Sequence, residues 1–557
     1  MLASRCLLLV TVVVAAAACA PTAPGQGNSS AVSQAPAAPK ILTLVGREGV
    51  IGDFPGVQGR EGGAGGFVHD NLTIQDARDV AVARLAEEVI SVERGTWRVN
   101  PDGTMDTIWK IRPNIKWHDG TPFTVDDLMF TYTAFKDPEL PSRYGEALKL
   151  MTSAEIVDPL TFVVHWSQPY ATANQAPALN PMPRHLLEDL YKNDKANFGD
   201  TTRFHRDLVG TGAYKIVRWE SGSHIEFARF DDYYMGRPSL DTVIVKFMSD
   251  PNAILANALA GTVDIVFDKN ALDVEQGLEV ERRWQGTSNQ VRYVASPRVI
   301  SVELQYRREF ARPQYGLIER DVRYALLHGI DRTALIEAVT YGKAPLANSW
   351  VVPSADFFAL TEQAVPKYPY DVGRAQRLLA QVGWTTGSDG ILAHPATGER
   401  FEFDLWNRFP VHRDQAILAD SWKALGVQAN ARQLPLPRDR EFEARINGGQ
   451  MMDQTINDYT LGRLATSDIA TAANRYTSRN LGAYSNPRLD PLITKLALTV
   501  DAREQGAIHR DLVVEAFTDL ALLPLYFQVT PMLLKEGITG PEGGANVVWN
   551  FHEWDKR

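Results

Sequence analysis

The chain has 557 residues, of which 45% are hydrophobic and 22% are charged, and its formal net charge at pH 7 is −10. This acidic balance argues against a nucleic-acid partner, because nucleic acids select basic faces. The length exceeds that of an ordinary single domain, so several domains are expected.

Residues 1–18 have the pattern of a secretory signal. Arg5 supplies a positive charge, and an apolar stretch of 12 residues runs from Leu7 to Ala18. A bilayer span needs roughly 20 apolar residues, so this stretch suits the apolar region of a signal peptide better. The small residues before Cys19 resemble a bacterial lipobox, although Ala16 stands where Leu is commonest. We therefore expect signal peptidase II to cleave there and Cys19 to be acylated; an ordinary signal cleavage nearby is the alternative.

Residues 19–39 are predicted to form the lipidated Cys19 and a flexible tether. After Cys19 they contain mostly Ala, Pro, Ser, Gly and Gln and no charge, so they cannot bury a core. An acyl anchor with a tether predicts an exported protein that is anchored to the cell membrane as a lipoprotein. Cys6 would leave with the signal, so the mature chain would have neither a disulfide nor a Cys metal site.

The first half of the body contains strands, turns and one well-capped helix. A strand is predicted over 40–46 and a Gly-rich loop over 52–66. A hairpin follows, with a turn at 100–103 and a strand at 107–112 that has one buried face. After a second turn at 118–120, Thr124 is placed to cap a helix whose first turn carries Asp126 and Asp127.

The second half alternates strands and helices, which predicts an α/β fold. Gly261, Gly383 and Gly426 are placed to end three of the helices. The run of strand, helix and strand over 401–434 predicts a βαβ unit with parallel strands. The predicted strands are 225–228, 243–247, 401–406, 427–434 and 451–459, and the predicted helices are 253–260, 320–328, 332–341, 372–382 and 412–425.

The segment 97–130, WRVNPDGTMDTIWKIRPNIKWHDGTPFTVDDLMF, resembles the signature of a bacterial receptor family. Further motifs of that family follow in the expected order: VHDNLT at 68–73, LAEE at 85–88, NPMPRHL at 180–186, VGTGAYK at 209–215, YYMGRP at 233–238, AGTVDI at 260–265, DVRYAL at 321–326, GIDR at 329–332 and YSNPRLD at 484–490. The chain is thereby identified as a member of the family 5 extracellular solute-binding proteins, the peptide, nickel and oligosaccharide receptors of ABC importers.

The resemblance implies a two-lobed periplasmic-binding-protein fold with an extra domain. Domain I would be discontinuous, over 40–70, 207–295 and 525–557. Domain II would cover 71–206 and domain III 296–524. The resemblance also implies a ligand cleft between domains I and III.

Asp458 and Tyr459 are the first candidates for ligand binding. They resemble the Asp-Tyr element at the end of a domain III strand, where peptide-binding members pair the Asp with the ligand's α-ammonium. Thr455 stands where the family usually has Trp. The alternative is a turn Asp that accepts bonds from nearby backbone N–H groups.

Trp406, Asn407 and Arg408 are the second candidates. Trp406 ends a predicted strand and the other two follow it, and ligands in open α/β sheets lie outside the carboxyl ends of strands. Arg408 could bind a carboxylate bidentately and Trp406 could stack on a ring; a packed Trp beside a surface Arg is the alternative. The Gly-rich loop at 50–67 and Trp350 complete the candidates.

The predicted function is a substrate-binding receptor that captures an oligopeptide or a dipeptide-like solute by lobe closure. Its partners would be an ABC permease with its ATPase subunits, and the receptor would be a monomer. We expect no catalytic residues, no cofactor and no metal ion, because no nucleophile, zinc or phosphate-loop motif is found. Open alternatives are a receptor for an oligosaccharide or another small solute, a sensory or chaperone lipoprotein, and an extracytoplasmic hydrolase.

Overall fold

The computed structural model describes residues 38–46, 65–140, 145–198, 208–268, 271–314, 316–407, 413–433, 450–453, 463–476, 478–544 and 546–557. Residues 40–557 form one unit by their contacts. Within the described ranges, no helix is long and apolar enough to cross a membrane.

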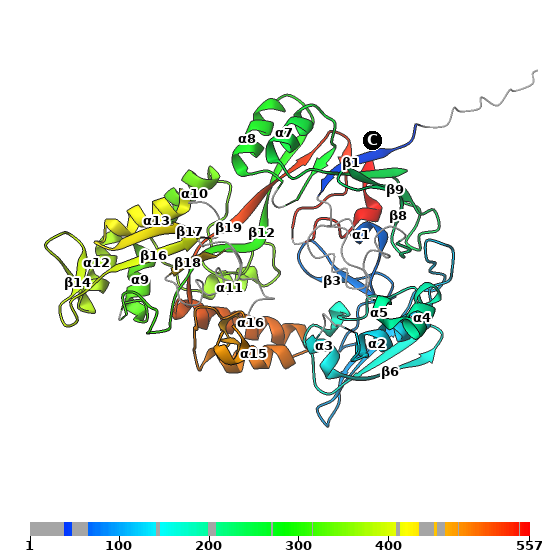
Figure 1. Cartoon of the computed structure of the whole chain (residues 1–557), viewed down its shortest axis with the longest axis horizontal. Helices are drawn as coiled ribbons and strands as arrows, with labels where there is room; N and C mark the ends of the chain where they lie inside the picture. Colours follow the sequence, from blue (N-terminus) through cyan, green and yellow to red (C-terminus); the bar gives the residue numbers. More distant parts are fainter. Residues whose placement is uncertain are drawn as a thin grey trace, which may run out of the picture. The chain divides into compact units, whose positions relative to one another are not determined.

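The largest element of the fold is a mixed sheet of ten described strands (Figure 1), ordered β17-β16-β18-β12-β19-β11-β1-β10-β9-β8. Its strands are β1 (Ile41–Gly46), β8 (Tyr214–Glu220), β9 (His224–Arg229), β10 (Thr242–Phe247), β11 (Ile265–Val266), β12 (Gln290–Glu303), β16 (Glu402–Asn407), β17 (Gln428–Gln433), β18 (Gln450–Asp453) and β19 (Leu522–Leu534). The parallel pairs are β1 with β10 and β11, and β16 with β17 and β18.

Two long antiparallel strands, β12 and β19, run through both halves of this sheet. Their pairing proceeds from Gln290↔Leu534 to Ala295↔Val529 and resumes at Val299↔Phe527. Three residues of β12 therefore lie opposite Gln528 alone, which makes a β-bulge with two extra residues and Pro297 at its centre. A proline cannot donate to the ladder, so a bulge is a place where a sheet tolerates it.

The half of the sheet around β1 shares its buried clusters with α1 (Gly65–Val68), α7 (Pro251–Leu259) and α8 (Val274–Arg283). The loop predicted over 52–66 is wrong at its end, since Gly65 and Gly66 begin α1. Packing overrides the local glycine preference here: the Phe67 ring stacks on Phe551 with centroids 3.7 Å apart and meets Phe227 edge-on.

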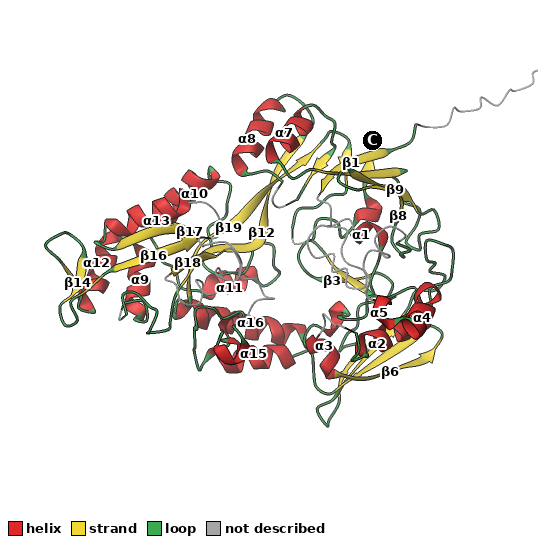
Figure 2. Cartoon of the chain, in the orientation of Figure 1, coloured by secondary structure: helices red, strands yellow, loops and turns green. Residues whose placement is uncertain are grey.

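The half around β16 confirms the predicted βαβ unit. Helix α13 (Arg413–Lys423) connects the parallel strands β16 and β17, and Gly426 after it has a left-handed φ of 81°. Figure 2 shows helices α9 (Arg320–His328), α10 (Arg332–Thr340) and α12 (Val372–Gln381) beside these strands. Their apolar faces share one buried cluster with β12, β16 and β19.

A separate four-stranded sheet, ordered β4-β5-β7-β6, has its own buried cluster. Its elements are β4 (Trp97–Val99), β5 (Met105–Lys110), β6 (Met151–Asp158), β7 (Thr161–Trp166) and α2 (Val125–Lys136). The predicted hairpin is present, but its second strand starts two residues early because Val99 pairs with Met105 directly after the turn. The Asp127 carboxylate accepts from the Thr124 N–H at 2.9 Å, which confirms the predicted helix start.

The remaining described helices and strands complete the fold, and among them α16 shares the buried cluster of β12 and β19. They are β2 (Thr73–Gln75), β3 (Ala81–Ala83), α3 (Gly145–Leu150), α4 (Arg184–Asn193), α5 (Lys195–Phe198), α11 (Phe358–Ala364), β13 (Thr385–Thr386), β14 (Leu392–His394), β15 (Glu399–Arg400), α15 (Leu489–Leu498), α16 (Ala502–Thr518), β20 (Ile538–Thr539) and β21 (Asp555–Lys556).

Candidate binding site

The carboxyl ends of β16, β17 and β18 meet at one edge of the ten-stranded sheet. Trp406 pairs with Met451 of β18 and with Arg432 of β17, all in parallel register. Asn407 ends β16 and is buried, whereas Trp406 is half-buried. The Trp406 indole Nε1 is covered and has no hydrogen-bond partner within the described residues. The structure thus places Trp406 and Asn407 where the sequence predicted them, at the end of a parallel strand.

Side chains at the start of α13 form hydrogen bonds to this edge of the sheet. The Gln415 amide donates to the Leu405 carbonyl at 2.6 Å and to the Arg432 carbonyl at 3.1 Å, so one side chain joins the ends of β16 and β17. The neighbouring Asp414 carboxylate accepts from the Tyr526 hydroxyl of β19 at 2.6 Å. Burial and the Asp414 charge raise the pKa of Tyr526, so this hydroxyl stays a donor.

Three predicted ligand-binding residues lie outside the described residues: Arg408, Asp458 and Tyr459. Cys19, Thr455 and the Gly-rich loop before Gly65 also lie outside them. The described part of β18 ends at Asp453, five residues before Asp458 in the chain.

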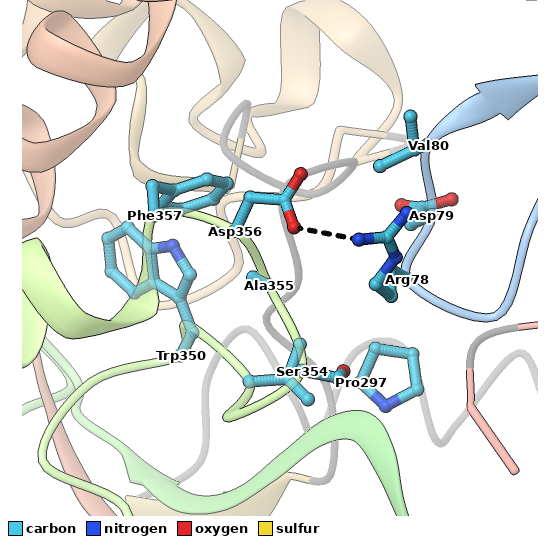
Figure 3. Close-up of a pocket in the computed structure, with 10 residues that line it drawn as sticks. Arg78, Asp79, Val80, Pro297, Trp350, Ser354, Ala355, Asp356 and Phe357 are labelled. Carbon is cyan, nitrogen blue, oxygen red and sulfur yellow. Dashed lines mark hydrogen bonds and ion pairs between the residues drawn. The ribbon is translucent and has the colours of Figure 1, made fainter.

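A cavity of about 150 Å³ lies between the turn that joins β2 to β3 and the segment 350–357 (Figure 3). The residues that line it are Arg78, Asp79, Val80, Pro297, Trp350, Val352, Ser354, Ala355, Asp356 and Phe357. Pro297 belongs to the bulge of β12, so the cavity adjoins the point where the two halves of the sheet meet. Trp350, predicted as a ligand residue, is therefore part of a cavity wall.

An exposed ion pair spans the two sides of this cavity. Arg78 lies 3.4 Å from the Asp356 carboxylate and 3.3 Å from Asp76 of its own turn. Both members of the Arg78–Asp356 pair are more than half exposed, so the pair contributes little stability by itself. The sequence analysis missed this pair, because the two residues are 278 positions apart and nothing local connects them.

A metal ion in a protein needs an arrangement of several ligating side chains. Within the ranges that the structure describes, no group of three or more His, Cys, Asp or Glu side chains is placed to hold a metal ion.

The chain matches one known family model and several known proteins. Residues 84–467 match the model of the bacterial extracellular solute-binding proteins, family 5. The oligopeptide-binding protein AppA of Bacillus subtilis is 24% identical over 481 residues, which covers 81% of each chain.

Two solved structures share the fold. The oligopeptide-binding protein from Thermus thermophilus complexed with a pentapeptide has a TM-score of 0.68 and 21% identity, over 93% of this chain and 96% of that one. NikA from Brucella suis in complex with Fe(III)-EDTA has a TM-score of 0.73 and 18% identity, over 93% and 100%. The two-lobed fold expected from the sequence is thereby confirmed.

Proposed function

Because the chain belongs to the bacterial extracellular solute-binding proteins of family 5, we propose that it is the receptor of an ABC importer. It captures an oligopeptide or a dipeptide-like solute and delivers it to a membrane permease with its ATPase subunits. The relative from Bacillus subtilis, whose name gives it as an oligopeptide-binding protein, supports a peptide as the solute.

The structural observation that carries this proposal is the interrupted pair β12 and β19. Both strands run through the two halves of the ten-stranded sheet, and the bulge at 296–298 breaks their ladder between the halves. A few residues at the ends of paired segments can absorb the backbone rotation of a hinge. Closure about this point would bring the two lobes onto the solute, and solute contacts would stabilise the closed state.

The domain division that fits this mechanism is the one expected from the sequence. Domain I covers 40–70, 207–295 and 525–557, domain II 71–206 and domain III 296–524, with the solute between domains I and III. The bulge at 296–298 adjoins the proposed boundary at 295/296, which supports it. Trp406, Asn407 and Arg408 would line the domain III side of the cleft.

Asp458, with Tyr459 beside it, is proposed to anchor the amine end of the peptide. A carboxylate that loses water on lobe closure needs a cation or several donors, and an α-ammonium supplies both. Truncating one partner of such a pair costs about 2–5 kcal/mol, so Asp458→Ala should weaken a free-amine peptide by roughly 30-fold or more.

Calorimetry on a free-amine peptide and its N-acetylated form, with wild-type protein and Asp458→Ala, tests this assignment. The acetylated peptide should bind wild-type protein weakly and respond little to the substitution. Equal losses for both peptides would make Asp458 structural. Tight binding of an oligosaccharide or a metal complex in place of either peptide would favour the alternative solutes.

The proposed receptor returns its solute unchanged and works as a monomer that is anchored through acylated Cys19. Incubation of the protein with its solute should therefore give no product. Steady conversion that is lost in a single point variant would instead support the hydrolase alternative.

A further inference from the structure

We propose that the cavity beside Pro297 receives one uncharged group of the bound solute, about the size of a benzene ring, with an oxygen that accepts a hydrogen bond from Trp350. This inference rests on the proposed receptor function and specifies the class of solute. A tyrosine side chain carries this chemistry, and so does a phenol ring of a non-peptide solute.

The size and the walls of the cavity suit such a ring. Its volume is about 150 Å³, which is enough room for one benzene-sized ring. Aliphatic and aromatic side chains supply much of the lining: Val80, Pro297, Val352, Ala355 and Phe357. A ring placed here would be taken out of water on several sides, which favours apolar groups over strongly hydrated ones.

Trp350 supplies an unused donor at this cavity. Its ring is only 1% exposed and packs against Phe517, with centroids 4.9 Å apart. Its buried Nε1 has no hydrogen-bond partner within the described residues. Figure 3 shows the nitrogen edge of the indole facing the side where Ala355 and Asp356 lie.

Most of the fully buried tryptophans in the described part of the chain have a partner for the indole N–H. Six described tryptophans are less than 2% exposed, and four of them donate within the described residues: Trp117 to Asp127, Trp166 to Thr107, Trp422 to Leu326 and Trp554 to Asn550. Trp109 and Trp350 are the two exceptions in this set, and the half-buried Trp406 also lacks a partner; of these three, Trp350 is the one that lines the cavity. A buried donor without an acceptor is costly, so a solute oxygen that reaches it gains the missing bond.

The charges at the cavity select against an ionised group. Arg78 is engaged by Asp76 and Asp356, and Asp79 adds a further carboxylate to the lining. An anion would meet three carboxylates and one guanidinium, whereas a cation would compete with Arg78 for the same carboxylates. An uncharged ring avoids both costs, and the exposed Arg78–Asp356 pair can part and re-form over it at little cost.

Fluorine NMR titration of the full chain with 4-fluorophenol and fluorobenzene tests the inference. The two probes share the fluorinated ring, and only 4-fluorophenol carries a hydroxyl oxygen. Wild-type protein should bind 4-fluorophenol roughly 3- to 10-fold more tightly, as expected for one neutral hydrogen bond. Trp350→Phe should remove this preference and leave fluorobenzene within about 2-fold of its wild-type affinity.

Two control variants keep the test decisive. Trp422→Phe removes an indole whose N–H donates to the Leu326 carbonyl at 2.9 Å in the same buried cluster, and it should leave both affinities unchanged. Ala355→Leu fills the cavity and should weaken both probes together, which gives a second readout if Trp350→Phe does not fold. Equal affinity of wild-type protein for the two probes, or a preference that survives in Trp350→Phe, would overturn the proposal.

A competition arm separates this inference from the receptor proposal. The peptide Gly-Gly-Tyr-Gly-Gly should displace 4-fluorophenol at lower concentration than Gly-Gly-Phe-Gly-Gly if the group comes from a peptide. A probe preference without displacement by either peptide would keep the cavity and its donor but remove the peptide as its source. Displacement by both peptides without any preference between the probes would keep peptide binding and remove the role of Trp350.

Discussion

His118 and Gly210 form two reciprocal hydrogen bonds. The His118 Nδ1 accepts from the Gly210 N–H at 3.2 Å, and the His118 backbone N–H donates to the Gly210 carbonyl at 2.9 Å. On the other side of the ring, Nε2 lies 3.0 Å from the Gly212 carbonyl, which can only accept. The contacts therefore require the neutral ring with its proton on Nε2. The segment 97–130 and the motif VGTGAYK at 209–215, which both carry the family resemblance, therefore contact each other and help to hold the fold together.

Gly212→Ala should strongly destabilise the fold. A Cβ at this position would lie 2.5 Å from the Val68 carbonyl carbon and 2.6 Å from the Phe67 carbonyl oxygen, and backbone atoms cannot move aside as a side chain can. We expect a loss of at least about 2 kcal/mol in the free energy of unfolding, measured by urea denaturation.

Gly506→Ala is the matched control for this substitution. Gly506 lies inside α16, and nothing is within 4 Å of the position a Cβ would take. Alanine is the better helix former, so this variant should be neutral or more stable by up to about 1 kcal/mol. A Gly212→Ala variant as stable as Gly506→Ala would contradict the packing account.

Stability should fall as the pH decreases from 7 to 5.5. Burial lowers the pKa of His118 to about 4, that of His69 to about 3 and that of His552 to about 4. An unfolded histidine titrates near 6.5, so between pH 6.5 and about 4 the unfolded chain binds protons that the folded chain does not. Each such histidine destabilises the fold by roughly 1 kcal/mol between pH 7 and pH 5.5.

Urea denaturation of wild-type protein and His118→Gln at both pH values isolates one of these contributions. Burial raises the pKa of Asp70 and of Asp127, so these two carboxyl groups add stability to the fold as the pH falls. This opposite contribution is the same in both proteins. The variant should lose less stability than wild-type protein between pH 7 and pH 5.5. An identical loss in the two proteins would show that His118 is already protonated in the fold.

Tyr526→Phe should lower both stability and solute affinity. The variant removes the buried hydroxyl that donates to Asp414 at 2.6 Å, at the helix start that supports Trp406 and Asn407. Loss of a donor to a buried carboxylate costs about 1–3 kcal/mol, which urea denaturation should detect.

Tyr293→Phe is the corresponding control, because its hydroxyl donates to Glu281 at a partly buried position, at 3.1 Å. It should cost less than about 1 kcal/mol on the same scale and leave the solute affinity unchanged. If Tyr526→Phe behaves like Tyr293→Phe in both measurements, the Asp414 contact does not position the sheet edge.

Cys19→Ala should release the protein from membranes into the soluble fraction. The reason is chemical, since alanine has no thiol to acylate, and fractionation followed by immunoblotting measures the change. Cys6→Ala serves as the control and should leave membrane association intact, because Cys6 precedes the proposed cleavage site. Wild-type protein that is already soluble, or that starts at another residue, would contradict the proposed anchor.

Local elements of the fold were predictable from the sequence, and long-range pairing was not. Helix α9 has the predicted bounds at both ends, because helix signals lie within a few residues of each other. The pairing of β12 with β19 joins segments more than 200 positions apart, and its bulge has no local signature besides Pro297. The parallel sheet inferred from the βαβ unit is accordingly only part of a mixed sheet.

The candidate site was predictable in part for the same reason. Trp406 and Asn407 could be placed at a strand end, since strand, helix and strand follow one another in sequence. Trp350 was predicted as a ligand residue, but its burial against Phe517 and its place beside Pro297 depend on tertiary packing. The Arg78–Asp356 pair depends on the same packing and has no trace in the local sequence.

Solute binding without turnover is the central claim, and mass spectrometry of the purified full chain tests it most directly. Native spectra should show one solute per chain, and denaturing extraction should return a peptide or a peptide-like solute of unchanged mass. Added back, this solute should bind with a single site by calorimetry. A chain that carries no solute and binds none from a peptide mixture, or that converts the extracted solute to a product, would contradict the receptor function.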